Sequence, residues 1–496
     1  MNVADMLSTG ARRFGNKPAL IAPDRTLSFN ELDQLSTRLA LHLRRLGIAP
    51  GDRVSLWLEN GWRWMVAYYG ILRSGAVVNP CNIVLAQDEV DFIANDCGAT
   101  AVIGARERVS GLRFPLVITD SMEEAGRGPN LEELLSIKVE CSERSALSRS
   151  KLGDIATVAY TSGTTGRPKG AQLSHSTILF NTFGTALMHG RSSADIVVSA
   201  LPCSHVYGNI VMNSAVLCGM TLVLFPRFDE TDMLHAIETH RATMFEGVPT
   251  MYIRMLNFSQ FSQFDLSSLR LCTVGGQTMP VSKMIEIEEK FGCRIIELWG
   301  MTEIGGLGIT HPHDGPERLG SIGVALPLTE AKVTAMDDPY EELPRDEIGE
   351  LLVRGPLVMQ GYLGNQTATE ATIEADGWLH TGDLVRQDAD GYFYVVDRIK
   401  EVILSGGYNV YPAEVERVIA EHPGVAMVAV AAIDDDLKGQ VAKAFVVRKS
   451  SSSCTEQEII EHCKVHLASY KVPRAVCFLE DLPKTSTGKI LRRALT

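Results

Sequence analysis

The sequence predicts an α/β protein with a large, multi-sheet N-terminal domain and a small C-terminal α+β domain. Up to about residue 345, apolar runs of strand length alternate with helical segments, which is typical of an α/β sandwich with largely parallel sheets. Beyond that point the pattern becomes helix, strand, strand, helix, strand over about a hundred residues, the usual size of a small domain. We place the boundary at 398–401, so that the two domains cover 1–399 and 400–496.

The first elements have clear boundaries. Ser28 and Glu31 form a capping box, and Gly47 ends the helical pattern that follows. Between them, leucines at helical spacing make one apolar stripe, at positions 32, 35, 39, 43 and 46. The strands expected next are 54–58, 76–78, 100–103, 116–118 and 155–160, with a second helix at 62–73.

The later part of the chain holds shorter elements. Strands are expected at 350–353, 392–396 and 402–404, separated by Gly and Asp. The small domain then reads as a helix at 414–421, strands at 426–433 and 441–447, a helix at 456–468 and a strand at 475–479. The polar segments 140–151 and 450–453 are expected to be surface connections.

Composition and charge narrow the class of protein. Of the 496 residues, 45% are hydrophobic and 22% are charged, which is typical of a globular chain with a large core. The net charge of −13 and the lack of a long basic run argue against a nucleic-acid partner. Ten cysteines without a C-x-x-C pair indicate reduced thiols, so we expect a cytoplasmic protein. The apolar stretch 211–226 is broken by Asn213, Ser214 and Gly219, so no transmembrane segment is expected.

The run TSGTTGRPKG, at 161–170, is the most informative stretch of the chain. It combines three glycines, four hydroxyl residues and Lys169 directly after an apolar strand. Glycines let backbone N–H groups approach phosphate oxygens, hydroxyls add donors and the lysine adds charge. The run does not fit the Walker pattern G-x-x-x-x-G-K-[ST]. We therefore expect a phosphate cradle of another kind; the alternative is an ordinary turn rich in Gly, Ser and Thr.

Six further motifs follow this run in a fixed order: LPCSHVYG (201–208), VGGQTMP (274–280), ELWGMTE (297–303), HTGD (380–383), DRIKEVILSGGYNVYPAEVE (397–416) and PKTSTGKILRR (483–493). The series resembles the adenylate-forming acyl-CoA synthetases, which are related to aryl- and fatty-acid–CoA ligases, luciferases and nonribosomal adenylation domains. The resemblance covers nearly the whole chain. It implies that ATP, Mg²⁺ and coenzyme A are used and that the C-terminal domain is mobile.

The implied chemistry has two steps. A carboxylate attacks the α-phosphate of MgATP to give an acyl-adenylate and pyrophosphate, and a thiol then takes the acyl group. Because the first step brings two anions together, catalysis depends on positioning and on cationic stabilisation. The resemblance implies that Ser162, Thr164, Thr165 and Lys169 hold the β- and γ-phosphates.

The ELWGMTE motif and the loop before it supply further nucleotide contacts by the same resemblance. Thr302 would contact the α-phosphate and Glu303 would hold Mg²⁺, an ion that takes few protein ligands; the alternative for Glu303 is a solvated charge at a helix end. Trp299 stands where many relatives have tyrosine, and either ring could stack on adenine. The remaining expected nucleotide contacts are Thr161, Gly163, Gly275, Gly276, Gln277, Glu297, Leu298, Gly300 and Met301.

Two motifs near the domain boundary resemble the ribose site and the hinge. Asp383 is expected to accept hydrogen bonds from both ribose hydroxyls, since a carboxylate suits two O–H donors; its alternative is an Asp in a turn. Arg398 is expected as a second ribose contact. Lys400 is expected at the hinge, with a plain surface lysine as the alternative.

The small domain is expected to contribute to each step in turn. Lys489 resembles the adenylation lysine, which would bridge the substrate carboxylate and the α-phosphate; the alternative is one more lysine in a basic tail. Ser405, Gly406 and Gly407 resemble the loop that lines the pantetheine tunnel once the domain has rotated. Bulky side chains there would block the thiol; a simple Gly-Gly turn is the alternative.

The acid-binding pocket is expected around LPCSHVYG. His205 and Tyr207 lie where relatives place acyl-pocket and gating residues, and His205 is also a catalytic candidate. The other expected lining residues are Val206, Gly276, Met301 and Gly306. Because most of these are apolar or small, the sequence favours a hydrophobic acid, aromatic or fatty.

Arg254 is the one feature that points to a different acid. It resembles an arginine that pairs with the distal carboxylate in malonate-activating relatives. Those enzymes use a second arginine at the position that Leu298 occupies here. We therefore expect Arg254 to lie on the surface of a helix and rank malonate low.

Other functions remain open from the sequence alone. A carrier-protein phosphopantetheine in trans could replace free CoA as the acceptor, and a luciferase-like oxygenase would form the same adenylate. A catalytically inactive nucleotide-binding protein would have lost catalytic groups, whereas those expected here are present. The sequence also leaves open whether the protein forms a homodimer.

Overall fold

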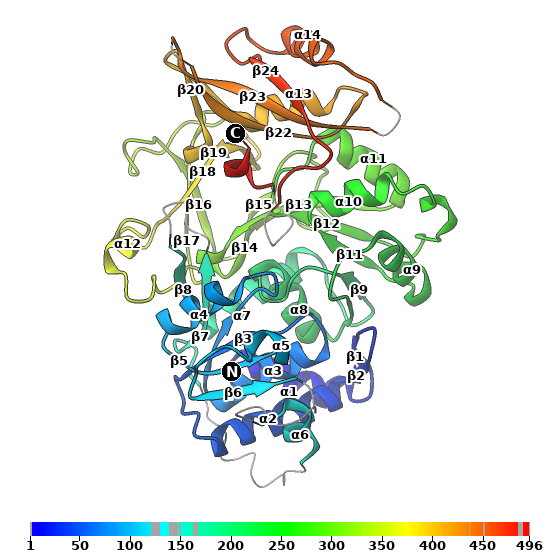
Figure 1. Ribbon diagram of the computed structural model, residues 1–496, viewed down its shortest axis with the longest axis vertical. Coiled ribbons are helices and arrows are strands. Elements are labelled where there is room, and N and C mark those ends of the chain that lie inside the picture. The colour runs from blue at the N-terminus through cyan, green and yellow to red at the C-terminus, as the bar shows by residue number, and fades with distance from the viewer. Residues whose placement is uncertain are drawn as a thin grey trace.

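The structure is a computed structural model, and it describes residues 2–120, 129–137, 147, 150–161, 167–435, 437–449, 452–484 and 490–495. Four sheets organise these residues, and helices cover the two larger ones (Figure 1). The predicted α/β fold, with a large N-terminal multi-sheet part and a smaller C-terminal part, is confirmed. The expected surface segment 140–151 and the loop 450–453 fall largely outside the described residues.

A six-stranded sheet carries the expected phosphate loop. Its order is β6-β5-β3-β4-β7-β8, and β8 is antiparallel to its neighbour while the other pairs are parallel. Its strands are β3 (Arg53–Trp57), β4 (Val77–Pro80), β5 (Ala99–Gly104), β6 (Leu116–Thr119), β7 (Ile155–Thr161) and β8 (Lys169–Ser174). Its helices are α4 (Gln87–Asp96), α5 (Arg106–Val109) and α6 (Leu131–Ser136). The strands predicted from apolar runs are all present.

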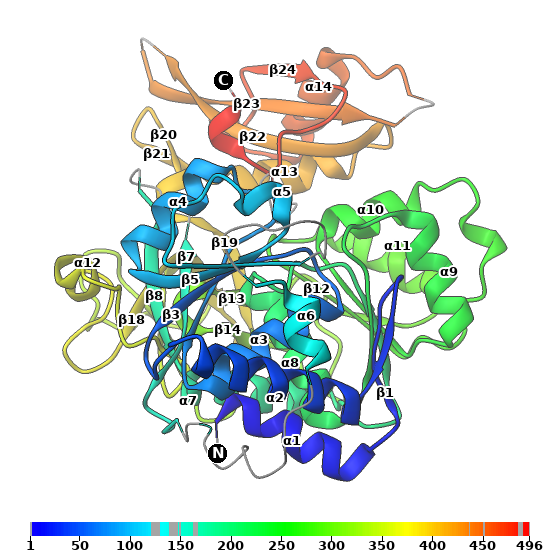
Figure 2. The same cartoon turned by 60° about the horizontal axis from the view of Figure 1, so that its bottom comes forward.

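A nine-stranded sheet forms the second large layer, in the order β15-β14-β13-β12-β11-β9-β10-β1-β2. Its central strands are β9 (Ile196–Ser199), β10 (Thr221–Leu224), β11 (Met244–Gly247), β12 (Leu271–Gly275) and β13 (Arg294–Met301), all parallel. The edges are β1 (Pro18–Ile21), β2 (Thr26–Ser28), β14 (Gly306–Thr310) and β15 (Val324–Ala325). Its outer helices are α9 (Glu230–His240), α10 (Pro249–Leu256) and α11 (Val281–Phe291) (Figure 2).

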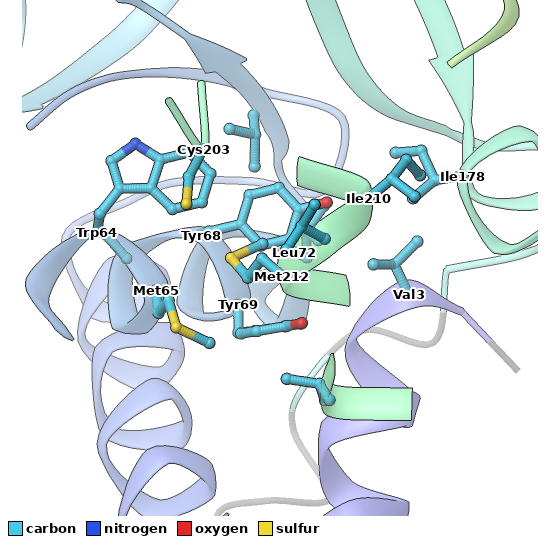
Figure 3. Close-up of a cluster of buried hydrophobic side chains, with 14 of the residues drawn as sticks. Val3, Trp64, Met65, Tyr68, Tyr69, Leu72, Ile178, Cys203, Ile210 and Met212 are labelled. Atoms are coloured by element: carbon cyan, nitrogen blue, oxygen red, sulfur yellow. The ribbon is translucent and has the colours of Figure 1, made fainter. Parts of the chain in front are cut away.

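Helices with apolar faces fill the main core. They are α1 (Val3–Phe14), α2 (Phe29–Arg45), α3 (Trp62–Ser74), α7 (His175–Met188) and α8 (Val206–Cys218). Figure 3 shows Tyr68 and Tyr69 of α3 near Met212 of α8, with Trp64 beside Cys203 and Ile210 beside Ile178. The capping box expected at the start of α2 is present, with Ser28 Oγ accepting from the Glu31 amide at 3.2 Å.

The helix α8 is also fixed to α3 by polar contacts inside this core. The hydroxyl of Tyr69 donates to Asn213 Oδ1 at 2.9 Å, and Asn213 Nδ2 donates to Asn209 Oδ1 at 2.8 Å. Buried polar groups that find partners in this way specify one arrangement of the two helices. The start of α8, where the expected acyl-pocket residues lie, is therefore held in place from behind.

Two antiparallel sheets complete the molecule. The third sheet has the order β16-β17-β18-β19, with β16 (Glu330–Thr334), β17 (Gly349–Arg354), β18 (Leu379–Gln387) and β19 (Phe393–Arg398). The fourth contains β20 (Ile403–Ser405), β21 (Tyr408–Val410), β22 (Val425–Asp435), β23 (Gly439–Arg448) and β24 (Ala475–Phe478), with β24 parallel to β23. Helices α12 (Gln366–Glu370), α13 (Pro412–Ala420) and α14 (Glu456–His466) accompany these two sheets.

The junction between the third and fourth sheets is short. Strand β19 ends at Arg398 and β20 begins at Ile403, and the carboxylate of Asp397 accepts from the Ala413 amide in the first turn of α13 at 2.8 Å. A carboxylate at a helix N-terminus is favourable both as a cap and towards the helix dipole. The division at 399/400 agrees with this change of sheet and stays a prediction. Within the described ranges, no helix has both the length and the apolar character needed to cross a membrane.

Candidate active site

The candidate site lies at the carboxyl edge of the nine-stranded sheet. Because β9, β11, β12 and β13 run parallel, the residues that follow them meet at one edge, where open α/β sheets commonly bind ligands. A cavity opens there between the loop after β9, the start of α8 and the strand ends. It is lined by Leu201, Pro202, His205, Val206, Tyr207, Gly208, Val248, Gly276, Leu298, Gly300, Gly306 and Leu307.

This lining contains five of the six residues expected in the acyl pocket. Met301 is the exception, since it packs at the edge of the hydrophobic cluster around Trp299 instead. The cavity itself is narrow, at about 30 Å³, which leaves room for no more than a few water molecules. Its walls are apolar apart from His205, so the cavity suits an apolar group.

His205 has a structural task at the start of α8. It is the N-cap residue, and its Nδ1 accepts from the Tyr207 amide at 3.3 Å. A ring held in this way satisfies one of the free amides of the helix. It also fixes the direction of the side chain at the cavity wall.

Glycine is required where β13 and β14 approach each other and α8. A Cβ atom on Gly300 would lie 2.0 Å from the Gly306 carbonyl oxygen. Gly306 has a φ of +144°, and a Cβ atom there would lie 2.6 Å from Ile210 Cγ1. Both positions therefore reject a side chain, and this part of the cavity wall is backbone.

The nucleotide end of the site begins at the β7–β8 hairpin. Thr161 and Lys169 are paired in register where the two strands of this hairpin join the loop between them. Ser162, Gly163, Thr164 and Thr165, expected to bind phosphate, lie outside the described residues. The Lys169 ammonium lies 4.9 Å from the ring centroid of Tyr362, a cation–π contact.

Tyr362 connects this lysine to Glu303. Its hydroxyl donates to Glu303 Oε1 at 2.7 Å, and both residues are buried. Burial and the neighbouring Glu303 carboxylate raise the pKa of Tyr362, so the phenol keeps its proton. Glu303 is in turn part of the short turn Thr302–Ile304, and half-buried Thr302 lies beside it. The structure thus brings Lys169, Thr302 and Glu303 together, with Tyr362 between the first and the last.

The expected ribose contacts also converge. Asp383 is buried on β18, and its Oδ1 forms an ion pair with Arg398 Nε at 2.9 Å. Its Oδ2 accepts from the indole Nε1–H of Trp299 at 2.8 Å. The bulge that shifts register between Trp299 and Gly300 occurs directly beside this contact. Trp299 therefore has a polar partner as well as a ring that could stack.

Glu297 is an acidic residue of the site whose pKa is strongly raised. It is buried on β13, and its Oε1 accepts from the Met279 amide at 2.9 Å. Burial raises the pKa of Glu297 to about 8, so at neutral pH the side chain is mostly a neutral acid. Gly275, Gly276 and Gln277 lie on the adjacent strand end, where Gly276 adopts a φ of +91°.

The residues expected to act from the small domain are only partly described. Gly406 and Gly407 form the tight turn between β20 and β21, with φ values of +58° and +84°. Ser405 is buried before this turn, and Lys400 is exposed in the short helical turn Ile399–Glu401. Lys489 lies outside the described residues, but Lys484 and Ile490 on either side of its segment pair with each other.

Arg254 lies apart from the cavity. It is about half exposed on α10 and forms a two-pronged ion pair with Glu230, at 2.5 and 2.6 Å. The prediction of a helix-surface arginine is therefore confirmed. No cluster of three or more His, Cys, Asp or Glu side chains suited to a metal ion occurs among the described residues.

The sequence analysis missed several residues that the structure brings to the site. Tyr362 lies in QGYLG, outside the motifs used, and only its spatial contact with Glu303 reveals it. Leu201 and Pro202 begin the LPCSHVYG motif, so their place in the cavity wall could have been inferred from their neighbours. Val248 follows the end of β11 and Leu307 lies at the start of β14, and neither position carries a polar signal in the sequence.

The site has the character of a nucleotide-using enzyme whose second substrate is apolar. The chain belongs to the AMP-binding enzyme family, which matches residues 7–363, and the C-terminal domain of that family matches residues 414–489.

The chain is similar to several CoA ligases and synthases over most of their length. The chain is 33% identical to a long-chain-fatty-acid–CoA ligase of Bacillus subtilis, covering 99% of this chain and 93% of the relative. It is 35% identical to a feruloyl-CoA synthase of Amycolatopsis sp., covering 94% and 92%. The crystal structure of the anthranilate CoA ligase AuaEII in complex with anthranoyl-AMP superposes with a TM-score of 0.92, at 29% identity, covering 100% and 96%.

Proposed function

We propose that this protein is an ATP-dependent acyl-CoA synthetase that activates a hydrophobic carboxylic acid. It forms an acyl-adenylate with release of pyrophosphate and then transfers the acyl group to coenzyme A. The single observation that carries this proposal is that contacts from two other sheets meet the end of β13 beside the apolar cavity: Lys169 reaches Glu303 through Tyr362, and Asp383 bonds to Trp299. The relatives' names, all of CoA ligases or synthases, support the same activity.

In the first step, the acid's carboxylate attacks the α-phosphorus of ATP and pyrophosphate leaves. Lys169 and the hydroxyls of Ser162, Thr164 and Thr165 would hold the β- and γ-phosphates, and Thr302 would contact the α-phosphate. Lys489 would lie between the two reacting anions and neutralise charge as the new bond forms. Asp383 would accept from the ribose hydroxyls, and Arg398 would hold that carboxylate in place.

A divalent cation fits this site through Glu303. The carboxylate is buried, and Tyr362 occupies one of its oxygens, which leaves the other oxygen free of that hydrogen bond. One carboxylate together with phosphate oxygens and water is a common arrangement for Mg²⁺. Bound Mg²⁺ would supply charge neutralisation on the phosphates. Glu303 would orient it, and Tyr362 would orient Glu303.

In the second step, a thiol attacks the acyl carbonyl and AMP leaves. The tight turn at Gly406 and Gly407, preceded by Ser405, would line the approach of the pantetheine thiol after the small domain turns about Lys400. A hairpin tip without side chains can lie close to a narrow substrate. His205 at the cavity wall would lie near the reacting carboxyl group.

Free CoA is the proposed acceptor, in a cytoplasmic location. A carrier-protein phosphopantetheine in trans is the second candidate, because it presents the same thiol arm. A homodimer also remains a proposal, and neither of these partners alters the roles given above.

The experiment measures AMP and pyrophosphate release with MgATP for a panel of aryl and aliphatic acids, each with and without CoA. We expect CoA-dependent turnover on apolar acids and none on malonate. Pyrophosphate release that CoA does not accelerate would favour a carrier protein. Light emission or oxygen uptake would favour an oxygenase, and ATP binding without any product would contradict the proposal.

A further inference from the structure

The inner wall of the acyl cavity is the ring of Tyr207, and this residue is anchored from behind. The side chain is buried and lines the cavity. Its hydroxyl lies 2.8 Å from Thr273 Oγ1 on β12, directed away from the space where a substrate would lie. Burial raises the pKa of Tyr207, so the phenol stays protonated and can donate.

The hydrogen bond of Tyr207 is the first in a buried series. Thr273 Oγ1 donates to Glu246 Oε2 at 3.1 Å, so the same oxygen accepts from Tyr207. Glu246 on β11 forms an ion pair with Arg191 at 2.7 Å, and the side chains of both residues are at most 1% exposed. The direction of donation is therefore set from the tyrosine to the carboxylate.

Arg191 has further partners through its two Nη atoms, whereas its Nε is buried without a hydrogen-bond partner among the residues that the structure describes. Its Nη1 donates to Ser214 Oγ on α8 at 2.7 Å, and its Nη2 donates to His189 Nδ1 at 3.1 Å. Burial and the adjacent guanidinium lower the pKa of His189, so the ring is neutral and its Nε2–H can donate to Thr310 Oγ1 at 3.0 Å. The series ends on the Glu297 carbonyl oxygen, which accepts from Thr310 at 3.3 Å.

This arrangement prevents the cavity from extending past Tyr207. An alkyl chain that displaced the ring would meet an ion pair that is already shielded from water. Separating the two charges, or removing the hydrogen bond from Thr273 to the carboxylate, is costly, because a buried charge without a partner is strongly unfavourable. Gly208 and Gly306 contribute backbone to the cavity wall, and a Cβ atom on Gly208 would already lie 2.3 Å from the Pro202 carbonyl oxygen.

We infer that Tyr207, held by Thr273 and the Glu246–Arg191 pair, limits the substrate to a compact acid: a single aromatic ring or a short chain, not a long extended one. The inference rests on the proposed function and adds the substrate class. It sets the protein apart from the relatives that are named for long-chain fatty acids.

The test is the acid profile of the full-length enzyme, measured as AMP release with MgATP and CoA. The panel runs from butanoic to hexadecanoic acid and includes benzoic and cinnamic acids. We expect kcat/KM for the best compact acid to exceed that for hexadecanoic acid by about tenfold or more, a difference of about 1.4 kcal/mol. A wild-type optimum at tetradecanoic or hexadecanoic acid would overturn the inference while leaving the proposed function intact. Absence of AMP with every acid would instead remove the proposed function, and the inference with it.

Two variants test the anchor itself. Tyr207→Ala should raise the ratio of long-chain to compact-acid kcat/KM by about tenfold or more. Thr273→Val keeps the ring but removes its 2.8 Å partner and leaves only the Thr273 carbonyl, at 3.4 Å, so it should shift the same ratio in the same direction by less. Tyr252→Phe is the matched control, because the Tyr252 hydroxyl donates to the Thr273 carbonyl at 2.7 Å but does not line the cavity. An unchanged ratio in Thr273→Val, or an equal shift in Tyr252→Phe, would contradict the role of the anchor.

Discussion

Trp299 and Asp383 are joined by a hydrogen bond of 2.8 Å between the indole Nε1 and Oδ2, although they lie on different sheets and 84 residues apart. Asp383 is also paired with Arg398, so each of its oxygens has a fixed partner. The tryptophan therefore orients the carboxylate that we propose for ribose binding, in addition to offering a ring for adenine.

Replacing Trp299 by Phe should weaken ATP binding through Asp383. The ring remains, but the donor is lost, and a hydrogen bond to a charged group contributes about 1.5–3 kcal/mol. We expect the KM for ATP to rise about tenfold with a smaller change in kcat. Steady-state kinetics with ATP varied at saturating acid measures this.

Trp378→Phe serves as the control for that experiment, because Trp378 packs against Arg354 (4.7 Å from guanidinium to ring) on the third sheet. An equal rise in the KM for ATP in both variants would show a general loss of stability instead of a lost contact with Asp383.

Removing the hydroxyl of Tyr362 should disturb the proposed cation site. Without its 2.7 Å hydrogen bond, Glu303 is free to turn away from the nucleotide. We expect Tyr362→Phe to need about tenfold more Mg²⁺ for half-maximal adenylation, which corresponds to about 1.4 kcal/mol. A titration of Mg²⁺ at fixed ATP in a pyrophosphate-release assay gives the value.

The comparison for Tyr362 is Tyr394→Phe, which removes a hydroxyl that donates to Asp388 at 3.2 Å. If Tyr362→Phe titrates with Mg²⁺ as the wild type does, Glu303 does not depend on this hydroxyl.

His380 makes part of the stability depend on pH. Its two ring nitrogens each lie 2.9 Å from a carboxylate, of Glu350 and Glu374, and the first of these raises the pKa of His380 most, to about 9. The folded pKa lies above the ordinary value of 6.5, so the stabilisation is complete below pH 6.5 and is lost as the pH rises through 9.

We expect that loss to be about 1–2 kcal/mol, reduced by the partial exposure of the histidine. Denaturant unfolding at pH 6 and pH 9.5 should show a smaller decrease for His380→Gln than for the wild type. Equal decreases would mean that the two carboxylates do not hold the protonated ring.

Glu297 should make folding stability depend on pH over a lower range than His380 does. Its pKa is raised to about 8, so between about 4.5 and 8 the unfolded chain loses a proton that the folded chain keeps. Stability therefore falls as the pH rises across this window and changes no further above it. Glu297→Gln still offers an oxygen to the Met279 amide and cannot titrate.

The difference in stability between pH 5 and pH 8 should be smaller in Glu297→Gln by about 2–4 kcal/mol. Glu289→Gln, on the exposed face of α11, should behave as the wild type does. A wild-type slope in Glu297→Gln would indicate that Glu297 is ionised in the folded protein.

The sequence predicted local elements well where the signal was local. Ser28 and Glu31 lie three residues apart, so their capping box could be read directly, and it is present. Helix α1 was missed although Asn2 and Asp5 form the same box, because its apolar face is short and holds a single leucine. The third sheet was not expected as a separate layer, because its pairings join residues far apart, such as Lys332 with Leu352.

Only site residues that stand within the sequence motifs could be predicted from the sequence. His205, Val206 and Tyr207 in LPCSHVYG, and Leu298 and Gly300 in ELWGMTE, were expected at the site because they stand in those motifs. Tyr362 and Glu246 could not be found in this way, since each acquires its role from a contact with a residue distant in sequence. The phosphate-binding hydroxyls and Lys489 stay predictions.

The hydrogen bonds behind Tyr207 also bear on how such an enzyme can change over evolution. They join α8 to strands β11 and β12 and to the loop before β9, so the depth of the cavity is tied to the folding of the whole sheet. A single substitution at Glu246 or Arg191 would leave its partner charged and buried, at a cost of about 3–5 kcal/mol. Changes at the buried ion pair would therefore require coordinated replacements, whereas Tyr207 itself can change alone. Selection for stability would preserve the pair behind the ring even while the ring itself varied.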